Sequence, residues 1–176
     1  MLDRDGVINE DSDEYIKSIA EWRPIAGSLE AIGLLTRAGY RVVVVTNQSG
    51  VGRGLLNEAT LGAIHGHMLA AVRAAGGELT GVYYCPHTPD AGCDCRKPRP
   101  GLFKRVEREL RLSVRGVPYI GDKLSDVDAA EAVDALPMLV RTGRGARTEP
   151  EAAARGVAVF DDLAAVAQTL LAAAGA

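Results

Sequence analysis

The sequence predicts an α/β fold in which a mainly parallel sheet is covered by helices on both faces. Strand-like and helix-like segments alternate along most of the 176 residues, which is typical of parallel sheets with crossover helices. The run YRVVVV at residues 40–45 is almost continuously β-branched, as expected for a strand buried on both faces. Helix-like segments on either side of this run end at glycine, a common residue just after a helix C-terminus.

Two well-marked helices flank that strand. Residues 28–38 have the apolar spacing of a helix, and Gly39 ends it. After the strand at 40–45, Asn57 is a suitable N-cap for a long helix that runs to Ala75. This part of the chain therefore predicts a helix, a strand and a helix in succession.

The second half continues the alternation in shorter segments. The expected strands are 82–84, 117–120, 138–140 and 157–160, and the expected helices are 102–110, one from Ser125 and one from Asp161. Ser125 and Asp128 have the spacing of a capping box. The polar, irregular segment Asn9–Arg23 predicts an active-site loop or flap. Because no repeat or linker is visible, we expect one domain over residues 1–176.

Composition limits the class of protein. The net charge of −3, with 47% hydrophobic and 24% charged residues, is that of an ordinary globular protein. The charge gives no basic footprint for nucleic acid. No apolar run approaches the length of a membrane span, and the first residues do not resemble a signal peptide. We therefore expect a cytoplasmic monomer with no nucleic-acid or membrane partner.

Four polar clusters follow predicted strands or open a predicted helix. They are Asp3 with Asp5, Thr46-Asn47-Gln48-Ser49-Gly50, Arg96-Lys97-Pro98, and Gly121-Asp122-Lys123. Ligands of open parallel sheets bind beyond the carboxyl ends of the strands, so these clusters are expected to share one cleft. Converging carboxylates require a cation among them, and Mg²⁺ takes oxygen ligands and is often shared with a phosphate. With two basic residues to hold the remaining phosphate charge, the set predicts a phosphoryl-transfer site.

The pair Asp3 and Asp5 fits a two-step reaction. One aspartate can act as nucleophile and form an aspartyl-phosphate, while the other can protonate the leaving group and then activate water. Each cluster alone has an ordinary structural explanation, since Asp and Gly favour turns and single cations are mostly solvated. The ordered set of four makes the catalytic interpretation the stronger one.

The segments DRDGVIN, VVVVTNQSGVGRG, CDCRKPRPG and GDKLSD resemble, in order, the four motifs of the haloacid-dehalogenase-like (HAD) phosphatases. Among these they are most similar to the D-glycero-D-manno-heptose 1,7-bisphosphate 7-phosphatases, and the resemblance covers nearly the whole chain. It implies a three-layer, Rossmann-like (HAD-like) α/β fold without a large cap domain. It also implies a magnesium-dependent phosphomonoester hydrolase that removes the 7-phosphate of this small phosphorylated sugar through an aspartyl-phosphate.

The resemblance also implies roles for individual residues. Asp3 is the expected nucleophile and Asp5 the general acid/base. Thr46 would hydrogen-bond the transferred phosphoryl group, and Lys97 would neutralise it. Magnesium would be held by the carboxylates of Asp3 and Asp122 and by the backbone carbonyl of Asp5.

Further residues are expected around this centre. Those expected to contact the substrate are Asp11, Tyr15, Asn47, Arg96 and Lys123, with residues 11–15 as a flap over the sugar. Asp126 is expected to support the metal site from behind, although a position at a helix N-terminus explains it equally well. His65 and His67 lie two residues apart on a predicted helix, so they do not share a face and receive no role.

A second metal site is predicted by a cluster of sulfur and imidazole side chains. Its members are Cys85, His87, Cys93 and Cys95, all within eleven residues. Zinc takes four such ligands tetrahedrally, and a site filled by protein ligands is structural. Buried, apolar cysteines are the alternative, but the loop is polar. Because Cys95 directly precedes Arg96 and Lys97, zinc would clip the loop that aims both cations.

Other functions remain open at this stage. A histidinol-phosphate phosphatase has similar catalytic motifs and a similar short zinc loop, but TNQSGVGRG and GDKLSD resemble the heptose branch more. A non-catalytic, zinc-stabilised domain is disfavoured by the full set of catalytic residue types. A nucleic-acid end phosphatase is disfavoured by the acidic net charge.

The start of the chain raises a separate question. Only Met1 and Leu2 precede Asp3, whereas strands usually contain about five or six residues. We expect either a stunted first strand with a poorly supported nucleophile, or a native start upstream of Met1.

Overall fold

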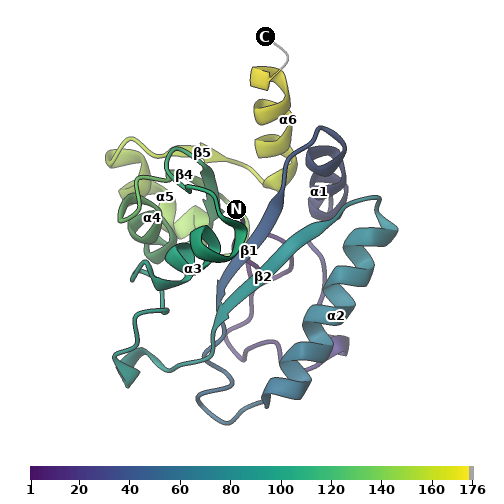
Figure 1. Ribbon diagram of the computed structural model, residues 1–176, viewed down its shortest axis with the longest axis vertical. Coiled ribbons are helices and arrows are strands. Elements are labelled where there is room, and N and C mark those ends of the chain that lie inside the picture. The colour runs from purple at the N-terminus through teal and green to yellow at the C-terminus, as the bar shows by residue number, and fades with distance from the viewer. Residues whose placement is uncertain (175–176) are drawn as a thin grey trace.

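Five strands and six α-helices alternate along residues 1–174, the part of the chain that this computed structural model describes (Figure 1). The strands are β1 (Val42–Asn47), β2 (Leu79–Cys85), β3 (Pro118–Gly121), β4 (Leu136–Val140) and β5 (Ala158–Phe160). The helices are α1 (Ser28–Arg37), α2 (Glu58–Ala74), α3 (Gly101–Leu110), α4 (Leu124–Glu131), α5 (Gly145–Ala154) and α6 (Leu163–Ala174), with 3-10 turns at Ile19–Glu21 and Pro89–Ala91. The predicted α/β fold is confirmed.

One residue, Leu2, joins two groups of parallel strands. β1 pairs with β2, and β3, β4 and β5 pair in that order. Leu2 forms parallel bridges to Val44 and to Ile120, so the order across the molecule is β2-β1-Leu2-β3-β4-β5. The segment before Asp3 is therefore a single-residue bridge rather than a full strand.

The expected poor support of Asp3 is wrong, because the backbone of this short segment is bonded on both sides. On one side, the N–H of Leu2 donates to the carbonyl of Val43 and the N–H of Val45 donates to that of Leu2, both at 2.8 Å. On the other side, the N–H of Asp3 donates to Ile120 O at 2.8 Å. Both edges of the segment are paired, and Asp3 is buried.

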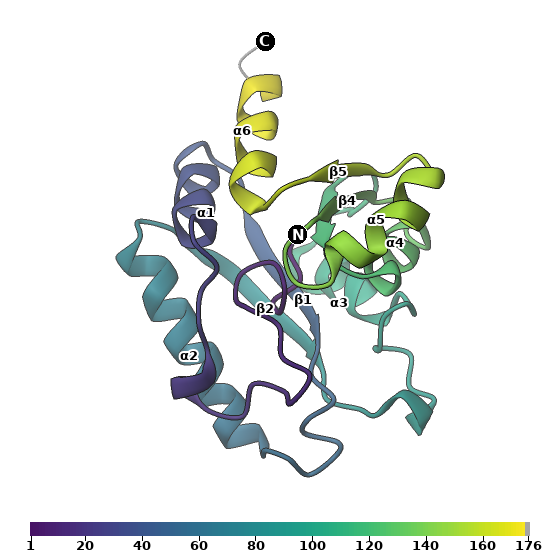
Figure 2. The same ribbon diagram turned by 180° about the vertical axis from the view of Figure 1, so that it is seen from behind.

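Helices cover both faces of the strands, which gives the expected three layers. Val42 and Val44 of β1 belong to a core shared with α1, α2 and α6, whereas Val43 and Val45 face a core shared with α3 and α4. A smaller apolar cluster lies between β4, α4 and α5. The two helix groups lie on opposite sides of the central strands in Figures 1 and 2. None of the helices in residues 1–174 has the length and apolar character needed to span a bilayer.

Several boundaries differ from the prediction. β1 extends to Asn47 and β2 begins at Leu79, so the polar cluster at residues 46–50 starts inside a strand rather than after it. The helix α5 was not predicted, because Pro150 and the glycines near its ends obscure the helical pattern of GARTEPEAAA. In α4 the N-cap is Lys123 rather than Ser125, since the carboxylate of Asp126 accepts the Lys123 N–H at 3.0 Å.

The segment after Asp5 lies across the carboxyl ends of the strands. Figure 2 shows this N-terminal segment in purple, in front of β1 and β2, running to the 3-10 turn beside α2. Trp22, directly after that turn, packs edge-on against His67 of α2 with ring centroids 5.4 Å apart. The segment Asn9–Arg23 is thus anchored at its far end. Residues of its first part line a cavity at the carboxyl ends of β1 and β3.

Candidate active site

The four predicted polar clusters meet at the carboxyl ends of β1 and β3. A cavity of about 230 Å³ opens there, and members of every cluster line it. They include Asp3, Asp5, Thr46, Asn47, Lys97 and Lys123. Since β1, Leu2 and β3 are adjacent parallel segments, their carboxyl ends bring these residues together, as the topology predicts.

The ammonium group of Lys97 lies at the centre of the site, and its side chain is only 1% exposed. Its Nζ lies 3.1 Å from Asp3 Oδ1 and 2.7 Å from Asp126 Oδ1. It also donates to Val45 O at 2.9 Å and to the hydroxyl of Tyr119 at 2.6 Å. Burial alone would lower the pKa of Lys97, but the two carboxylates outweigh burial and raise its pKa. The site therefore holds a fixed positive charge beside Asp3.

Three buried carboxylates, those of Asp3, Asp122 and Asp126, offer oxygens that lie within 4.8 Å of one another. Burial, opposed in part by Lys123, raises the pKa of Asp122 to about 7. Among residues 1–174, Asp122 Oδ1 makes no hydrogen bond, although Lys123 Nζ is within ion-pair distance at 3.4 Å. A buried acceptor without a hydrogen bond is unfavourable, and a hard cation would satisfy it. The carboxylates of Asp3 and Asp122 therefore fit Mg²⁺.

Asp126 uses both oxygens within the protein. Oδ1 accepts from the Lys97 ammonium and, at 3.3 Å, from the hydroxyl of Tyr119. Oδ2 accepts the backbone N–H groups of Asp122 and Lys123 at 3.2 and 3.0 Å. It therefore holds the backbone of Asp122 and also occupies the first turn of α4, an arrangement that fits both support of the metal site and an ordinary position at a helix N-terminus.

Two glycines make room for Asp122. Gly6 and Gly143 have φ of 86° and 60°, values that favour glycine. A Cβ at either position would overlap Asp122 Oδ2. The same oxygen accepts the backbone N–H of Arg144 at 2.8 Å. Asp122 is therefore enclosed by the turn after Asp5 on one side and by the loop before α5 on the other.

Asp5 is held by a buried cation that the sequence analysis missed. The guanidinium of Arg4, a residue that is 1% exposed, donates to both oxygens of Asp5 at 2.9 and 3.0 Å. Asn9 and Gln48 each donate a further hydrogen bond to Asp5 at 2.8 Å. His65 lies behind, with Nε2 3.3 Å from Arg4 Nη1, so this histidine is part of the support of the site.

The burial of His65 has an electrostatic consequence. Burial, with a smaller contribution from the charge of Arg4, lowers the pKa of His65 to about 4. A neutral imidazole can accept from the Arg4 guanidinium. His67, which shares no face with His65, is exposed and packs on Trp22. The signal that could have distinguished the two histidines is position, since only His65 follows the buried face of α2.

The candidate substrate contacts surround the cavity mouth, and most are already engaged. Asn47 pairs with the backbone of Lys97, donating to its carbonyl and accepting its N–H, both at 3.1 Å. Arg96 donates to His87 O at 3.3 Å. Lys123 Nζ lies 3.2 Å from Asp11 Oδ2.

The flap carries its own charge and strain. Burial alone would raise the pKa of Asp11, but Lys123 and Arg144 outweigh it, so the pKa of Asp11 is lowered and the group is ionised at neutral pH. Tyr15 adopts a φ of 63° and its ring lies 5.9 Å from the guanidinium of Arg53. Arg144, which also lines the cavity, was not predicted from sequence.

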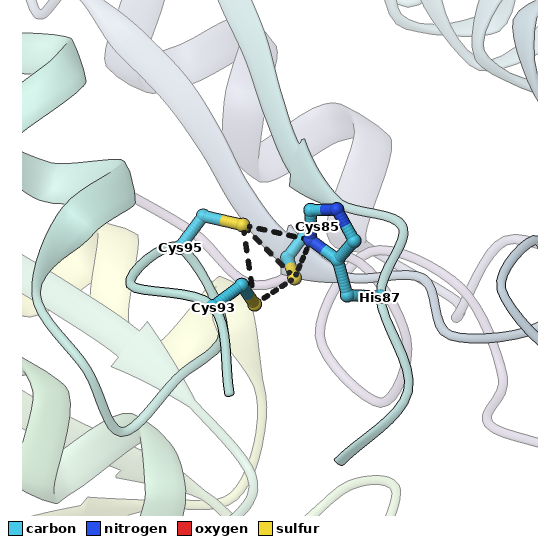
Figure 3. A group of neighbouring side chains, drawn as sticks. All are labelled: Cys85, His87, Cys93 and Cys95. Atoms are coloured by element: carbon cyan, nitrogen blue, oxygen red, sulfur yellow. Dashed lines mark hydrogen bonds between the residues drawn. The ribbon is translucent and has the colours of Figure 1, made fainter. Parts of the chain in front are cut away.

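The four predicted zinc ligands converge in one loop (Figure 3). The sulfur–sulfur distances among Cys85, Cys93 and Cys95 are 3.2–3.6 Å, and His87 Nδ1 lies 3.6 and 3.2 Å from the sulfurs of Cys85 and Cys95. Bond lengths of about 2.0–2.3 Å to a tetrahedral zinc place ligand atoms roughly 3.3–3.8 Å apart. The Cys₃His site could hold zinc.

Hydrogen bonds connect this loop to the catalytic cavity. Cys95 is followed directly by Arg96 and Lys97, and Lys97 is fixed by its backbone pair with Asn47. Near the start of the same loop, Pro86 O accepts the N–H of Gly52 at 2.8 Å. The zinc loop, residues 85–97, therefore contacts the loop after β1 and ends at Lys97 in the cavity.

Comparison with known proteins places this site in a class. A model of the HAD-hydrolase-like family matches residues 94–166. The D-glycero-beta-D-manno-heptose-1,7-bisphosphate 7-phosphatase of Pseudomonas aeruginosa is 50% identical over 171 residues, covering 97% of this chain and 96% of that protein. A crystal structure of D,D-heptose 1,7-bisphosphate phosphatase from Bordetella bronchiseptica, complexed with magnesium and phosphate, superposes with a TM-score of 0.93 at 48% identity, covering 97% and 96% of the two chains.

Fold, site and relatives together define a phosphatase of the HAD-like class, which confirms the predicted enzyme class. The homologous enzyme of Pseudomonas putida, also named for the heptose bisphosphate, is again 50% identical over 171 residues. The chain therefore belongs to the family of the D-glycero-beta-D-manno-heptose-1,7-bisphosphate 7-phosphatases.

Proposed function

We propose that this phosphatase removes the 7-phosphate of D-glycero-D-manno-heptose 1,7-bisphosphate and favours the β anomer, for which its relatives are named. The observation that carries the proposal is the 50% sequence identity to those enzymes over 97% of the chain. The arrangement of Asp3, Asp5 and Lys97 in one cavity supports it chemically. The cavity of about 230 Å³ is also of a size for a small ligand rather than a macromolecule.

The proposed reaction has two displacements at phosphorus. A carboxylate oxygen of Asp3 attacks the 7-phosphate, and the bond from phosphorus to the C7 oxygen breaks as Asp5 gives that oxygen a proton. Asp5 then removes a proton from water, which attacks the aspartyl-phosphate, releases inorganic phosphate and restores Asp3. Arg4, Asn9 and Gln48 donate to both Asp5 oxygens, which suits the carboxylate form that accepts a proton from water. To protonate the leaving oxygen, Asp5 enters the cycle as the carboxylic acid, and the proton taken from water restores that form.

Positive charge around the phosphoryl group lowers the barrier. The buried Lys97 ammonium stands 3.1 Å from Asp3 and would stabilise charge on the transferring oxygens, and the Thr46 hydroxyl would donate to one of them. Mg²⁺, held by Asp3, Asp122 and the Asp5 carbonyl, would supply electrostatic stabilisation of the phosphoryl oxygens. Arg96 and Lys123 would bind the remainder of the substrate.

The test compares substrates at saturating Mg²⁺. Initial rates of phosphate release are measured for both anomers of the heptose bisphosphate and for histidinol phosphate. The proposal predicts the highest kcat/KM for the β anomer, and no turnover by the Asp3→Asn variant. A higher kcat/KM for histidinol phosphate would assign the chain to the alternative activity, and magnesium-independent turnover would contradict the mechanism.

We also propose that the chain is one domain, a monomer, and located in the cytoplasm. The three thiols, which are free and grouped with His87 rather than paired as disulfides, suit a reducing compartment. Light scattering after size exclusion tests the oligomeric state, and a mass of twice 18.5 kDa would contradict the monomer.

A further inference from the structure

Four flap residues, Asp11, Ser12, Asp13 and Tyr15, line the cavity together with Ile16. Ile16 is buried in the core, whereas the flap before it, residues 11–15, has few attachments to the rest of the protein. Within residues 1–174, no backbone hydrogen bond joins this stretch to another part of the chain, and the one it makes is internal, from Tyr15 N to Ser12 O. Side chains therefore hold it. On one side, Tyr15 lies against the loop after β1 near Arg53. On the other side, Asp11 and Asp13 meet cations.

The main cation on that side is Arg144. Its Nε donates to Asp11 Oδ2 at 3.0 Å, and its Nη2 pairs with Asp13. Asp11 is also shared with Lys123 Nζ at 3.2 Å. Exposed ion pairs contribute little on their own, and Asp13 is 86% exposed. Asp11 is only 18% exposed and lies between two cations, so the Arg144–Asp11 pair is the stronger contact.

The backbone of Arg144 is fixed by its contacts with Asp122 and by its neighbours in the loop before α5. Its own N–H donates to Asp122 Oδ2 at 2.8 Å, and the preceding Gly143 packs so closely on Gly6 and Asp122 that a Cβ has no room. The hydroxyl of Thr148, one turn along α5, donates to Asp122 O at 2.9 Å. The Arg144 side chain therefore ties both Asp11 and Asp13 of the flap to a backbone that is immobilised beside Asp122, while Lys123 contacts Asp11 alone.

We infer that Arg144 is a positioning and specificity-determining residue, which holds residues 11–15 over the cavity so that they bind the part of the substrate beyond the transferred phosphate. This inference rests on the proposed function for the identity of that substrate. The reacting end depends on Asp3, Lys97 and Asp122, none of which contacts the Arg144 side chain. A substrate with a sugar must use the flap, whereas a small aryl phosphate needs only the reacting end.

The experiment uses the magnesium- and zinc-loaded enzyme and four proteins: wild type, Arg144→Ala, Arg144→Lys and Arg147→Ala. Replacement of the Arg144 side chain keeps the backbone N–H that holds Asp122. Arg147 is the matched control, since it is exposed on the same helix and no ion pair of its side chain occurs in the described part of the chain. Each protein is assayed with the heptose bisphosphate and with p-nitrophenyl phosphate, and amide hydrogen exchange is measured in parallel.

For Arg144→Ala we expect the KM for the bisphosphate to rise about tenfold or more, because a mispositioned flap binds the sugar end of the substrate less tightly, with kcat changed less. The kcat/KM for p-nitrophenyl phosphate should stay within about twofold of wild type. Exchange should become faster in residues 11–15 and remain unchanged in α2. Arg144→Lys should recover part of the bisphosphate KM, and Arg147→Ala should match wild type.

Three outcomes would overturn the inference. They are an unchanged KM for the bisphosphate, an equal loss on both substrates, and exchange in residues 11–15 that is the same in Arg144→Ala and wild type. If the wild-type enzyme hydrolyses p-nitrophenyl phosphate but not the bisphosphate, the proposed function fails, and the exchange measurement then decides the role of Arg144 alone.

Discussion

At the scale of single residues, the site depends on one buried cation among carboxylates. Lys97 faces Asp3 and Asp126 with almost no exposure. Replacement by Met would keep the length of the side chain and leave two buried carboxylates without their partner, which typically destabilises by about 3–5 kcal/mol. We predict that Lys97→Met lowers kcat by roughly 10²-fold or more and lowers the urea midpoint of unfolding.

Tyr119→Phe is the control for this prediction, because it removes a hydroxyl that contacts Lys97 Nζ and donates to Val45 O but keeps the charge. It should destabilise by about 1 kcal/mol and leave kcat within severalfold. If Lys97→Met were as active as Tyr119→Phe, the ammonium would have no part in catalysis.

His65 gives a prediction for the dependence of stability on pH. Its folded-state pKa of about 4 lies below the ordinary 6.5. Between these values the unfolded chain binds the proton and the folded chain does not, so stability falls as the pH decreases from 6.5 towards 4. The loss reaches roughly 3 kcal/mol below pH 4.

Urea unfolding at pH 7 and pH 4.5 measures this effect. The His65→Gln variant should lose less stability between the two pH values than wild type. His67→Gln is the matched control, since His67 is exposed on the same helix, and it should behave as wild type. Equal pH dependence in all three proteins would show that His65 does not carry the effect.

The sequence was sufficient for residues whose chemistry is local to a motif. The convergence of the four clusters and of the Cys₃His group could be predicted because parallel topology brings strand ends together and because the Cys and His residues lie within eleven residues. Arg4, His65 and Arg144 were missed. Arg144 was missed because its partner Asp11 is far away in sequence, and His65 because its role depends on which face of a helix is buried. Arg4 is adjacent to its partner Asp5, but the burial of its guanidinium depends on the tertiary structure.

At the scale of elements, the zinc loop should control the catalytic cation. Only Arg96 separates Cys95, the last member of the Cys₃His cluster, from Lys97. Asn47 accepts the backbone N–H of Lys97. Without zinc, the loop would be positioned by this contact, by the buried ammonium and by the hydrogen bond from Gly52 N–H to Pro86 O. We predict that zinc removal by a chelator, followed by Mg²⁺ repletion, lowers kcat by about tenfold or more and lowers Tm.

Metal analysis and circular dichroism accompany the measurement, so that loss of zinc and retention of the fold are both established. Re-addition of Zn²⁺ should restore turnover. A folded, zinc-free protein with full kcat would show that the loop needs no metal to aim Lys97.

Element boundaries were less predictable than the elements themselves. The helices α1 and α2 agree with expectation within about a residue, because their apolar spacing and caps are strong local signals. α5 was missed because a proline stands inside it and because its stability comes from packing on β4 and β5. The N-cap of α4 is Lys123 rather than Ser125 because Asp126 accepts the N–H groups of Asp122 and Lys123. This local contact starts the helix two residues earlier than the pattern of Ser125 and Asp128 suggests.

At the scale of the whole molecule, the sheet is continuous only through Leu2. In the described residues, β1 and β3 are joined by its two bridges, and its side chain is fully buried among residues of α1, α2 and α6. Asp3, the proposed nucleophile, follows immediately, so its position depends on the contact between the two halves of the sheet. Burial of one leucine thus couples stability to catalysis.

We predict that Leu2→Ala destabilises by about 2–5 kcal/mol and also lowers kcat by about tenfold or more, since small displacements of reacting groups have large effects on rate. Leu139→Ala is the matched control, because Leu139 is equally buried but lies in β4, against α4 and α5. It should destabilise by a similar amount and keep kcat near that of wild type when assayed well below its Tm. Equal kcat values for the two folded variants would mean that Asp3 is positioned without Leu2, by the pairing of its own N–H with Ile120 and by Lys97.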